Sequence, residues 1–227
     1  MFRWYDAARS IFENQNKSKE ARRDFFLKVK QKVDDCIEKV NKGIDSTAQA
    51  GFFAHIIKNS HNEKKGLTRA EMDSNATTFL GAGSETTATI LSGVTYLLLA
   101  NPDKYKKLVH EIRSRFSSAE EITTDALNDI EYLGAVFQEG LRMFPPVSTG
   151  IPRFVPRGGA KISGYYIPGG YTVLVNQHAA NLSTRNFKDP EKFVPERWLG
   201  DAKYKDDKFE VAQPFGFGAT PVSYTHL

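Results

Sequence analysis

The stretch Thr77-Thr-Phe-Leu-Gly-Ala-Gly-Ser-Glu-Thr-Thr-Ala-Thr89 lies inside a run from Leu67 to Ala100 that is otherwise mostly apolar. The run opens with a helix-start signal, because Thr68 and Glu71 have the three-residue spacing of a capping box. It closes at Asn101-Pro102, since proline disfavours helical geometry in the residue before it. We therefore predict one long helix over residues 67–100, buried in a sizeable core.

The middle of this predicted helix contains residues that disfavour a helix. Gly81 and Gly83 each cost about 1 kcal/mol relative to alanine in a helix interior. Thr86 can bond a carbonyl of the preceding turn, and Glu85 places a carboxylate where the surroundings should be dry. Such conflicts are expected at functional sites, where glycine admits a ligand and a carboxyl or hydroxyl relays protons. The alternative is a kinked core helix whose polar groups are satisfied by neighbours.

The overall composition is that of a folded protein. The chain has 227 residues, of which 40% are hydrophobic and 26% are charged. Its net charge of +4 is too small to indicate a nucleic-acid partner. The single cysteine, Cys36, excludes an intrachain disulfide and is expected to be packed on the apolar face of a charged helix over residues 17–41. We find no signal peptide and no apolar run long enough to span a membrane, so we expect the chain as written to be soluble.

The predicted elements change in kind along the chain. Helices come first, over residues 17–41, 67–100, 102–116 and 129–144. Short strand-like runs follow, at residues 147–155, 160–167 and 171–176. The last two runs are expected to pair as a hairpin, and a long irregular segment, residues 181–219, comes after them. The predicted fold class is therefore mainly α with a small antiparallel β region (α+β).

Two charged motifs stand in the second half of the chain. Glu139 and Arg142 are three residues apart on one predicted helix, so their side chains can pair. Glu20 and Arg23 share this spacing on a charged helix, where a weak surface pair is the simpler explanation. The first pair differs because its helix is otherwise apolar and ends at a double proline. Arg197 can bridge a carboxylate and backbone carbonyls, and so fix an irregular loop on that helix.

Four sequences, taken in their order along the chain, indicate a family. They are Ala82-Gly-Ser-Glu-Thr-Thr87, Glu139-x-x-Arg142, Pro195-Glu-Arg-Trp198 and Phe215-Gly-Phe-Gly218. This order resembles the C-terminal half of a cytochrome P450, a heme-thiolate monooxygenase and thus an oxidoreductase acting on paired donors. The sequence from Pro168 to Leu199 is similar to the fungal microsomal branch, which includes enzymes of secondary metabolism. The resemblance covers about residues 66–218 and implies the cytochrome P450 fold with a heme cofactor (iron protoporphyrin IX).

The resemblance also implies roles for residues of the central helix. The helix that carries Ala82 and Gly83 would cross one face of the heme. Thr86 would hydrogen-bond dioxygen or its water, and Glu85 would help to deliver protons for cleavage of the O–O bond. These two residues would thus be catalytic, with Ala82, Gly83 and Thr86 in contact with the cofactor.

The other matching residues would support or contact the heme. Glu139, Arg142 and Arg197 would form a structural triad that holds the heme-binding loop. Further contacts with the heme would come from Arg153, Phe215 and Gly218. Arg153 resembles the residue that pairs with a heme propionate, and the alternative is that it is simply an exposed arginine on a strand. Phe215 and Gly218 belong to the heme-binding loop. Residues 147–150 would line the pocket of a small hydrophobic substrate. An NADPH-cytochrome P450 reductase would supply electrons, so that NADPH acts indirectly.

The match to the family fails after Gly218. The family loop has an arginine at the position of Thr220 and the iron-ligating cysteine at the position of Val222. Valine cannot ligate iron, and His226 would not supply thiolate chemistry. We therefore expect residues 1–219 to be a partial cytochrome P450 domain, a C-terminal-half fragment without its metal ligand, and residues 220–227 to be a foreign or frameshifted tail. The chain itself is expected to be inactive.

Two alternatives stay open at this point. One is a non-catalytic, truncated remnant of such an enzyme. The other is a helical interaction module, unrelated to heme, that binds a partner through its basic N-terminal helices. For a full-length parent, the resemblance implies the cytoplasmic face of the endoplasmic reticulum membrane, reached through an N-terminal anchor that this sequence lacks.

Overall fold

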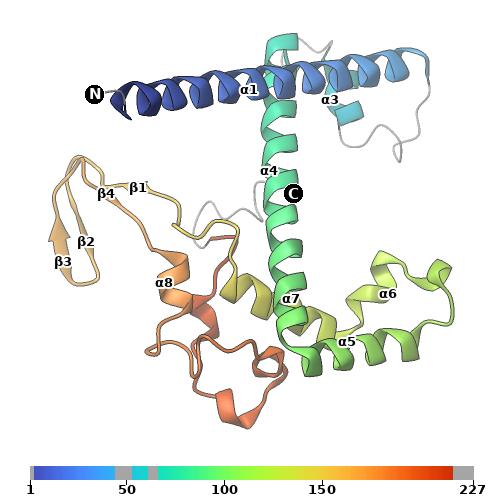
Figure 1. The fold of residues 1–227 in the computed structure, drawn as a ribbon, viewed down its shortest axis with the longest axis vertical. Coiled ribbons are helices and arrows are strands. Elements are labelled where there is room, and N and C mark those ends of the chain that lie inside the picture. The colour runs from blue at the N-terminus through green and yellow to red at the C-terminus, as the bar shows by residue number, and fades with distance from the viewer. Residues whose placement is uncertain (1–2, 44–52, 61–65, 217–227) are drawn as a thin grey trace. The chain divides into compact units, whose positions relative to one another are not determined.

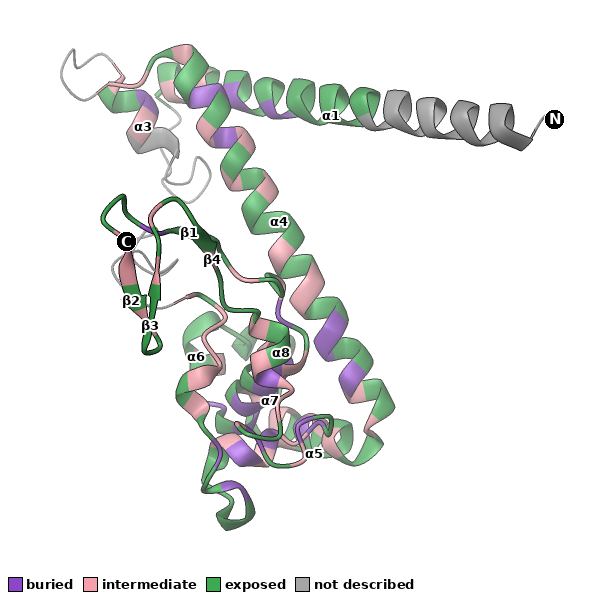
Figure 2. Ribbon diagram, turned by 90° about the vertical axis from the view of Figure 1, so that its left-hand side faces the viewer, coloured by how far each residue is buried: buried purple, intermediate pink, exposed green. Residues whose placement is uncertain are grey.

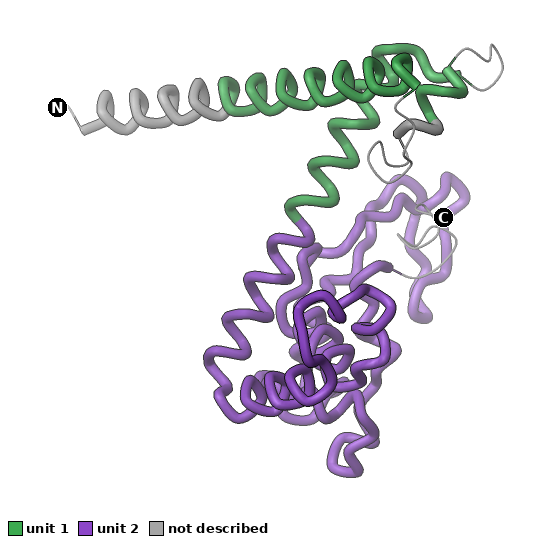
Figure 3. Tube along the Cα trace, turned by 90° about the vertical axis from the view of Figure 1, so that its right-hand side faces the viewer, with its two compact units in different colours: residues 1–85 green, residues 86–227 purple. Residues whose placement is uncertain are grey.

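The structure is a computed structural model that describes residues 3–43, 53–60 and 66–216, with the side chains of residues 3–18 and 53–55 excepted. Figure 1 shows the helices and strands, and Figure 2 shows how far each described residue is buried. The chain divides into two compact units, residues 1–85 and residues 86–227 (Figure 3). Their boundary falls within the long helix α4 (Arg69–Ala100), so α4 contributes residues to both.

The described part of the first unit is mainly helical. It contains α1 (Arg3–Asn41), α3 (Phe53–Asn59) and the first turns of α4. Val29 and Val33 of α1 pack with Ala76 of α4 as a small core, with Ile37 half-buried beside them. The apolar positions of α1 recur at helical spacing, so this core follows from the sequence pattern.

The second unit is built around α7 (Glu131–Met143). The rest of α4, α5 (Pro102–Arg115) and α6 (Thr124–Asn128) belong to the same unit. Its core contains six buried residues from α4, α5, α7 and the later irregular segment: Val94, Leu97, Leu108, Tyr132, Val136 and Phe193. Gly140 lets α7 approach α4, because a Cβ at this position would collide with the side chain of Val94.

The strands form two short antiparallel pairs. β1 (Arg153–Phe154) pairs with β4 (Thr172–Val173), and β2 (Ala160–Ile162) pairs with β3 (Tyr165–Ile167). The predicted hairpin between residues 160–167 and 171–176 is therefore wrong. The turn at Ser163 and Gly164 reverses the chain inside the first of these runs, since both residues have positive φ, 49° and 89°, as a two-residue hairpin turn requires.

The last part of unit 2 is irregular. It contains α8 (Gln177–Asn181) and three short 3₁₀ turns, η2 (Pro195–Leu199), η3 (Ala202–Tyr204) and η4 (Phe209–Val211). A further 3₁₀ turn, η1 (Ala119–Glu121), precedes α6. Helices with two small antiparallel sheets confirm the predicted α+β class.

Helix α4 differs from its prediction in burial, although its bounds agree. Val94 and Leu97 are buried, but Leu91 and Leu99 are 50% and 68% exposed. The prediction of a helix buried in a sizeable core is therefore met only on one part of its surface, where Val94 and Leu97 join the core of unit 2. Within the described ranges, no helix combines the length and the apolar character needed to cross a membrane.

Candidate functional site

The glycine- and threonine-rich segment of α4 is an unbroken helix. Ala82, Gly83 and Glu85 are exposed and Thr86 is half-buried. A Cβ added at Gly81 or Gly83 would meet nothing within 4 Å among the described residues. The dry surroundings predicted for Glu85 are therefore wrong for this structure, and the two glycines are not required by close packing.

Glu139 is the centre of a buried cluster of hydrogen bonds. Its Oε1 accepts from Arg142 Nη2 at 2.8 Å and from Arg197 Nε at 3.0 Å, and its Oε2 accepts from Arg142 Nε at 2.8 Å. The backbone N–H of Val194 and the indole N–H of Trp198 donate to the same carboxylate at 3.0 and 2.9 Å. Five donors around one buried carboxylate offset the large cost of removing it from water.

Arg142 joins α7 to the backbone of the irregular segment. Its Nη1 donates to the carbonyl oxygens of Asn181 and Pro190 at 2.9 and 2.7 Å, and its Nη2 donates to that of Lys192 at 3.2 Å. The Asn181 amide returns a bond, because its Nδ2 donates to the carbonyl of Arg142 at 2.9 Å. Arg142 and Asn181 are both fully buried, so this junction is dry.

Arg197 extends the cluster to a second carboxylate. Its Nη1 forms an ion pair with Asp207 Oδ2 and donates to the carbonyl of Lys188 at 3.1 Å. The other carboxylate oxygen of Asp207 accepts the Lys188 N–H at 2.7 Å. The side chains of Arg197 and Asp207 are 0% and 2% exposed, so the buried cluster holds two arginines and two carboxylates with no net formal charge.

Aromatic rings cover both guanidinium groups. The ring centroid of Phe187 lies 5.2 Å from Arg142 Cζ, and that of Tyr204 lies 4.6 Å from Arg197 Cζ. Trp198, which bonds Glu139, meets Phe209 edge to face at 5.0 Å between centroids. Such contacts add cation–π attraction and keep water from the ion pairs.

A second charged group holds η2 against α5 and α7. Glu196 lies 3.1 Å from both Lys104 Nζ and Lys107 Nζ, and Tyr132 Oη donates to it at 3.1 Å. Burial and the adjacent Glu196 charge raise the pKa of the Tyr132 hydroxyl above its ordinary value. Burial opposes ionisation of Glu196, but hydrogen bonds from the backbone and from the two lysines hold its pKa below the ordinary value.

The other predicted cofactor contacts lie at the surface of unit 2. Arg153 is exposed on β1, and its Nη1 donates to the carbonyl of Pro152 at 3.3 Å. Phe215 is 54% exposed. Gly218 and Val222 lie outside the described residues. The structure thus brings Glu139, Arg142 and Arg197 into one cluster, and it gives Arg153 and Phe215 no place in that cluster.

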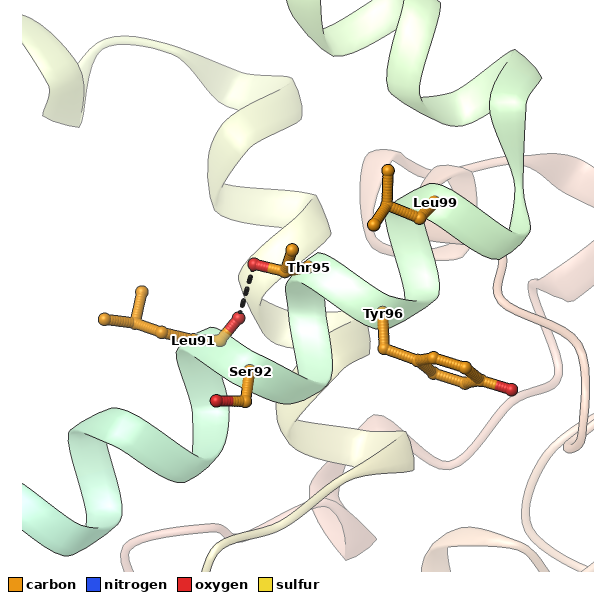
Figure 4. Close-up of a pocket in the computed structure, with 5 residues that line it drawn as sticks. All are labelled: Leu91, Ser92, Thr95, Tyr96 and Leu99. Atoms are coloured by element: carbon orange, nitrogen blue, oxygen red, sulfur yellow. Dashed lines mark hydrogen bonds between the residues drawn. The ribbon is translucent and has the colours of Figure 1, made fainter.

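A shallow depression of about 500 Å³ lies on the surface of α4 (Figure 4). It is lined by Leu91, Ser92, Thr95, Tyr96 and Leu99. Thr95 Oγ1 donates to the Leu91 carbonyl at 2.7 Å, which is an ordinary bond of threonine within a helix. All five lining residues come from one helix and none is a predicted site residue, so the depression does not define a ligand site.

Three members of the cluster were missed by sequence reasoning: Asn181, Trp198 and Asp207. The missing signal was charge balance. Burying Arg142 and Arg197 with the single carboxylate of Glu139 would leave one unpaired positive charge, so a second acid was required. Nothing in the spacing of Asp207 marks it as that acid, because it lies ten residues after Arg197 across irregular chain.

Comparison with known proteins identifies the family. The family model for cytochrome P450 matches residues 1–220. The chain is 51% identical over 174 residues to the cytochrome P450 monooxygenase traB of Penicillium crustosum. The matched residues make up 76% of this chain and 34% of that protein. It is 49% identical over 181 residues to lcsI of Purpureocillium lilacinum (80% and 35%), and 46% identical over 172 residues to aclL of Aspergillus oryzae (76% and 35%).

These matches show that the chain belongs to the cytochrome P450 family, so the family predicted from the sequence motifs is confirmed. The three relatives are fungal proteins, in agreement with the predicted branch. The chain spans about a third of the length of the curated relatives it matches.

Proposed function

We propose that the parent protein is a heme-thiolate monooxygenase that hydroxylates a small hydrophobic organic substrate. The balanced reaction is RH + O₂ + 2e⁻ + 2H⁺ → ROH + H₂O. The electrons come from an NADPH-cytochrome P450 reductase at the cytoplasmic face of the endoplasmic reticulum. Family membership and the monooxygenase names of the relatives support this proposal.

The observation that carries the proposal is the buried cluster around Glu139. Arg142 binds the backbone at Asn181, Pro190 and Lys192, and Arg197 with Asp207 holds the chain shortly before Phe215. A cofactor loop needs a fixed path, and supporting groups of this kind position the residues that contact the cofactor. In this proposal Glu139, Arg142 and Arg197 support the heme-binding loop and perform no chemistry.

The segment of α4 is proposed to face the cofactor. The helix is open at Gly81 and Gly83, since a Cβ there would meet no described atom within 4 Å, and such a surface admits a flat macrocycle close to the backbone. Glu85 and Thr86 follow on the same helix, and their carboxyl and hydroxyl groups hold and move protons. Heme, when bound, supplies the activation of dioxygen.

The residues present fit the porphyrin better than its iron. The exposed cation of Arg153 suits a propionate, and the exposed ring of Phe215 suits the edge of an apolar macrocycle. The iron ligand is missing from the sequence, because Val222 stands at the cysteine position and Cys36 belongs to α1 in the other unit. We therefore propose that the chain as written cannot form a thiolate-ligated heme and is inactive.

A chimera tests the assignment of residues. The matching segment of traB would be replaced by this chain up to Gly218, followed by the relative's own cysteine loop. We expect the reduced chimera to give the carbon monoxide band of a thiolate-ligated heme. Thr86→Ala should keep that band while substrate hydroxylation falls by roughly 10²–10⁴-fold, the range for a lost proton-transfer group. Thr95→Ala, on the exposed surface of α4, is the control.

Two results would reject the proposal. A folded chimera that takes up no heme would show that these residues do not hold the cofactor. Equal activity of the Thr86 and Thr95 variants would remove Thr86 from the mechanism. For the chain as written, a thiolate–carbon monoxide band from the purified 227-residue protein would overturn its proposed inactivity. Genomic sequence beyond the Gly218 codon separates a working gene, with arginine and cysteine in frame, from a natural remnant.

A further inference from the structure

The turn that follows α5 carries the only serine or threonine in the sequence with an arginine three residues before it. This serine is Ser118, which has Arg115 three residues and Arg113 five residues earlier. The turn joins α5 to η1 and lies between α5 and α6 (Figure 1). Protein kinases select substrates by charge patterns of this kind, because carboxylates in the substrate groove bind guanidinium groups at fixed distances from the hydroxyl.

The structure presents Ser118 at the surface. Residues 113–115 and 117–121 are exposed. The backbone leaves helical geometry at Phe116, with φ −114° and ψ 129°, and it is extended at Ser118, with φ −142° and ψ 164°. An enzyme groove takes a peptide as an extended segment, so the residues next to the hydroxyl already have a suitable conformation. Arg113 and Arg115 lie in the last turn of α5, and helix ends open at low cost.

One ion pair restrains this motif. Arg115 Nη2 lies 3.0 Å from Asp129 Oδ2, and the pair connects the end of α5 to the residue that follows α6. The two side chains are 44% and 70% exposed, and an ion pair between exposed groups is weak. Releasing Arg115 to a kinase should therefore slow phosphate transfer by no more than about fivefold.

Two glutamates after the serine offer a second charge pattern. Glu121 lies three residues after Ser118, which is a spacing that acid-directed kinases select. Both carboxylates are engaged inside the turn, because Glu121 Oε2 accepts the Ser117 N–H at 2.9 Å, and Glu120 accepts bonds from its own N–H and from the Ser118 hydroxyl. The arginines would also repel the basic groove of an acid-directed kinase. The charges around Ser118 therefore favour an arginine-directed kinase.

We propose that Ser118 is a phosphorylation site for an arginine-directed protein kinase. The hydroxyl oxygen of Ser118 attacks the γ-phosphorus of magnesium-bound ATP, the bond to the ADP oxygen breaks, and the hydroxyl proton passes to the catalytic aspartate of the kinase. The products are phosphoserine and ADP. Arg113 and Arg115 determine specificity, since each can bind a kinase carboxylate through two parallel hydrogen bonds. This modification goes beyond the proposed function and does not depend on heme.

Transfer of phosphate from γ-labelled ATP to the folded 227-residue chain by protein kinase B tests the proposal, with the modified residue identified by mass spectrometry. We expect Ser118→Ala to lose the label and Ser117→Ala to keep it. Arg113→Gln and Arg115→Gln should each lower kcat/KM for phosphate transfer about 10–100-fold, because a hydrogen bond between charged groups is lost.

A pair of variants separates recognition of Arg115 from its ion pair. Arg115→Gln and Asp129→Asn both remove the contact between these side chains, but Asp129→Asn should raise kcat/KM by up to about fivefold, because it releases Arg115. Lys106→Gln, an exposed change on α5, is the control and should have no effect. Unaltered denaturation midpoints show that the variants fold.

Four results would overturn the proposal. They are labelling of another residue in place of Ser118, equal rates for Arg115→Gln and Lys106→Gln, faster labelling of Ser118 by the acid-directed casein kinase 2 than by protein kinase B, and labelling that occurs only after the chain is unfolded in urea. The last result would show that the folded turn does not admit a kinase. None of these results bears on heme uptake by the chimera.

Discussion

The cluster around Glu139 and the segment of α4 over residues 81–85 differ in where their polar groups lie. In the cluster, two carboxylates and two arginines are buried and are bonded to one another and to the backbone. In the segment, the carboxyl of Glu85 and the open faces of Gly81 and Gly83 are presented at the surface. The first motif is defined by contacts inside the chain. The second is defined by what it leaves available to another molecule, so mutation should affect the two regions differently.

The largest effect is expected from Glu139→Leu. This change leaves Arg142 and Arg197 buried without their shared carboxylate, and breaking a buried ion pair costs about 3–5 kcal/mol. Urea denaturation of the whole chain measures the loss of unfolding free energy. Glu131→Gln, at the exposed start of α7, should stay within about 0.5 kcal/mol of wild type. Similar midpoints for the two variants would show that the cluster does not stabilise the fold.

A smaller loss is expected from Asp207→Asn. The substitution keeps the shape of the side chain but removes the charge that balances Arg197, and hydrogen bonds to charged groups contribute about 1.5–3 kcal/mol. The adjacent, exposed Asp206→Asn is the matched control in the same denaturation experiment. If both variants unfold at the wild-type midpoint, Asp207 is not part of the cluster in solution.

Gly140→Ala should destabilise the contact between α7 and α4. The new methyl group would collide with the side chain of Val94, and overpacking of this kind costs about 1–3 kcal/mol. Gly134→Ala on the same helix adds a methyl that meets no described atom within 4 Å, so it should stabilise the protein by up to about 1 kcal/mol. Thermal midpoints measure both changes: the midpoint should fall for Gly140→Ala and rise for Gly134→Ala. A change in the same direction for both variants would contradict the packing described for Gly140.

Gly83→Ala should raise the stability of the chain but lower heme uptake. No described atom lies within 4 Å of the added methyl, so helix propensity should stabilise the chain by about 1 kcal/mol. In the chimera with traB, the same methyl should lower heme uptake, because it occupies the surface proposed to face the macrocycle. Full heme loading of this variant would argue that the glycine serves the helix and not a ligand.

The smallest effect concerns pH. Because the pKa of Tyr132 is raised above the ordinary value of 10.0, its hydroxyl contributes stability that is complete below pH 10 and is lost as the pH rises further. We expect the wild-type chain to lose unfolding free energy between about pH 10 and pH 11 more steeply than Tyr132→Phe does. If the unfolding free energy of the two proteins depends on pH in the same way, the contact between Tyr132 and Glu196 is not the cause of the loss of stability above pH 10.

Local signals predicted the helices well. The capping box before α4 is present, since the backbone N–H of Thr68 donates to Glu71 Oε2 at 2.7 Å. Asn101-Pro102 ends α4 as predicted, and α5 begins at Pro102. These features depend on residues only a few positions apart, and such short spacings can be read from the sequence.

Long-range features were predicted less well. The hairpin was misplaced because Ser163-Gly164 was read as part of a strand, while the pairing of Arg153 with Val173 spans both strands of the observed hairpin. Asp207 was missed because no helical or strand period connects it to Arg197. The burial of α4 was overestimated, since an apolar sequence predicts that a face will be covered but not what covers it.

The way Arg142 binds its partners has a consequence for sequence variation. Its donors meet the carbonyl oxygens of Asn181, Pro190 and Lys192, and every amino acid supplies a carbonyl oxygen. The path of this segment is therefore fixed without prescribing the side chains at Pro190 and Lys192. Side chains can be exchanged along it, and so change the character of that surface, while the route of the backbone toward the loop proposed to bind heme stays the same.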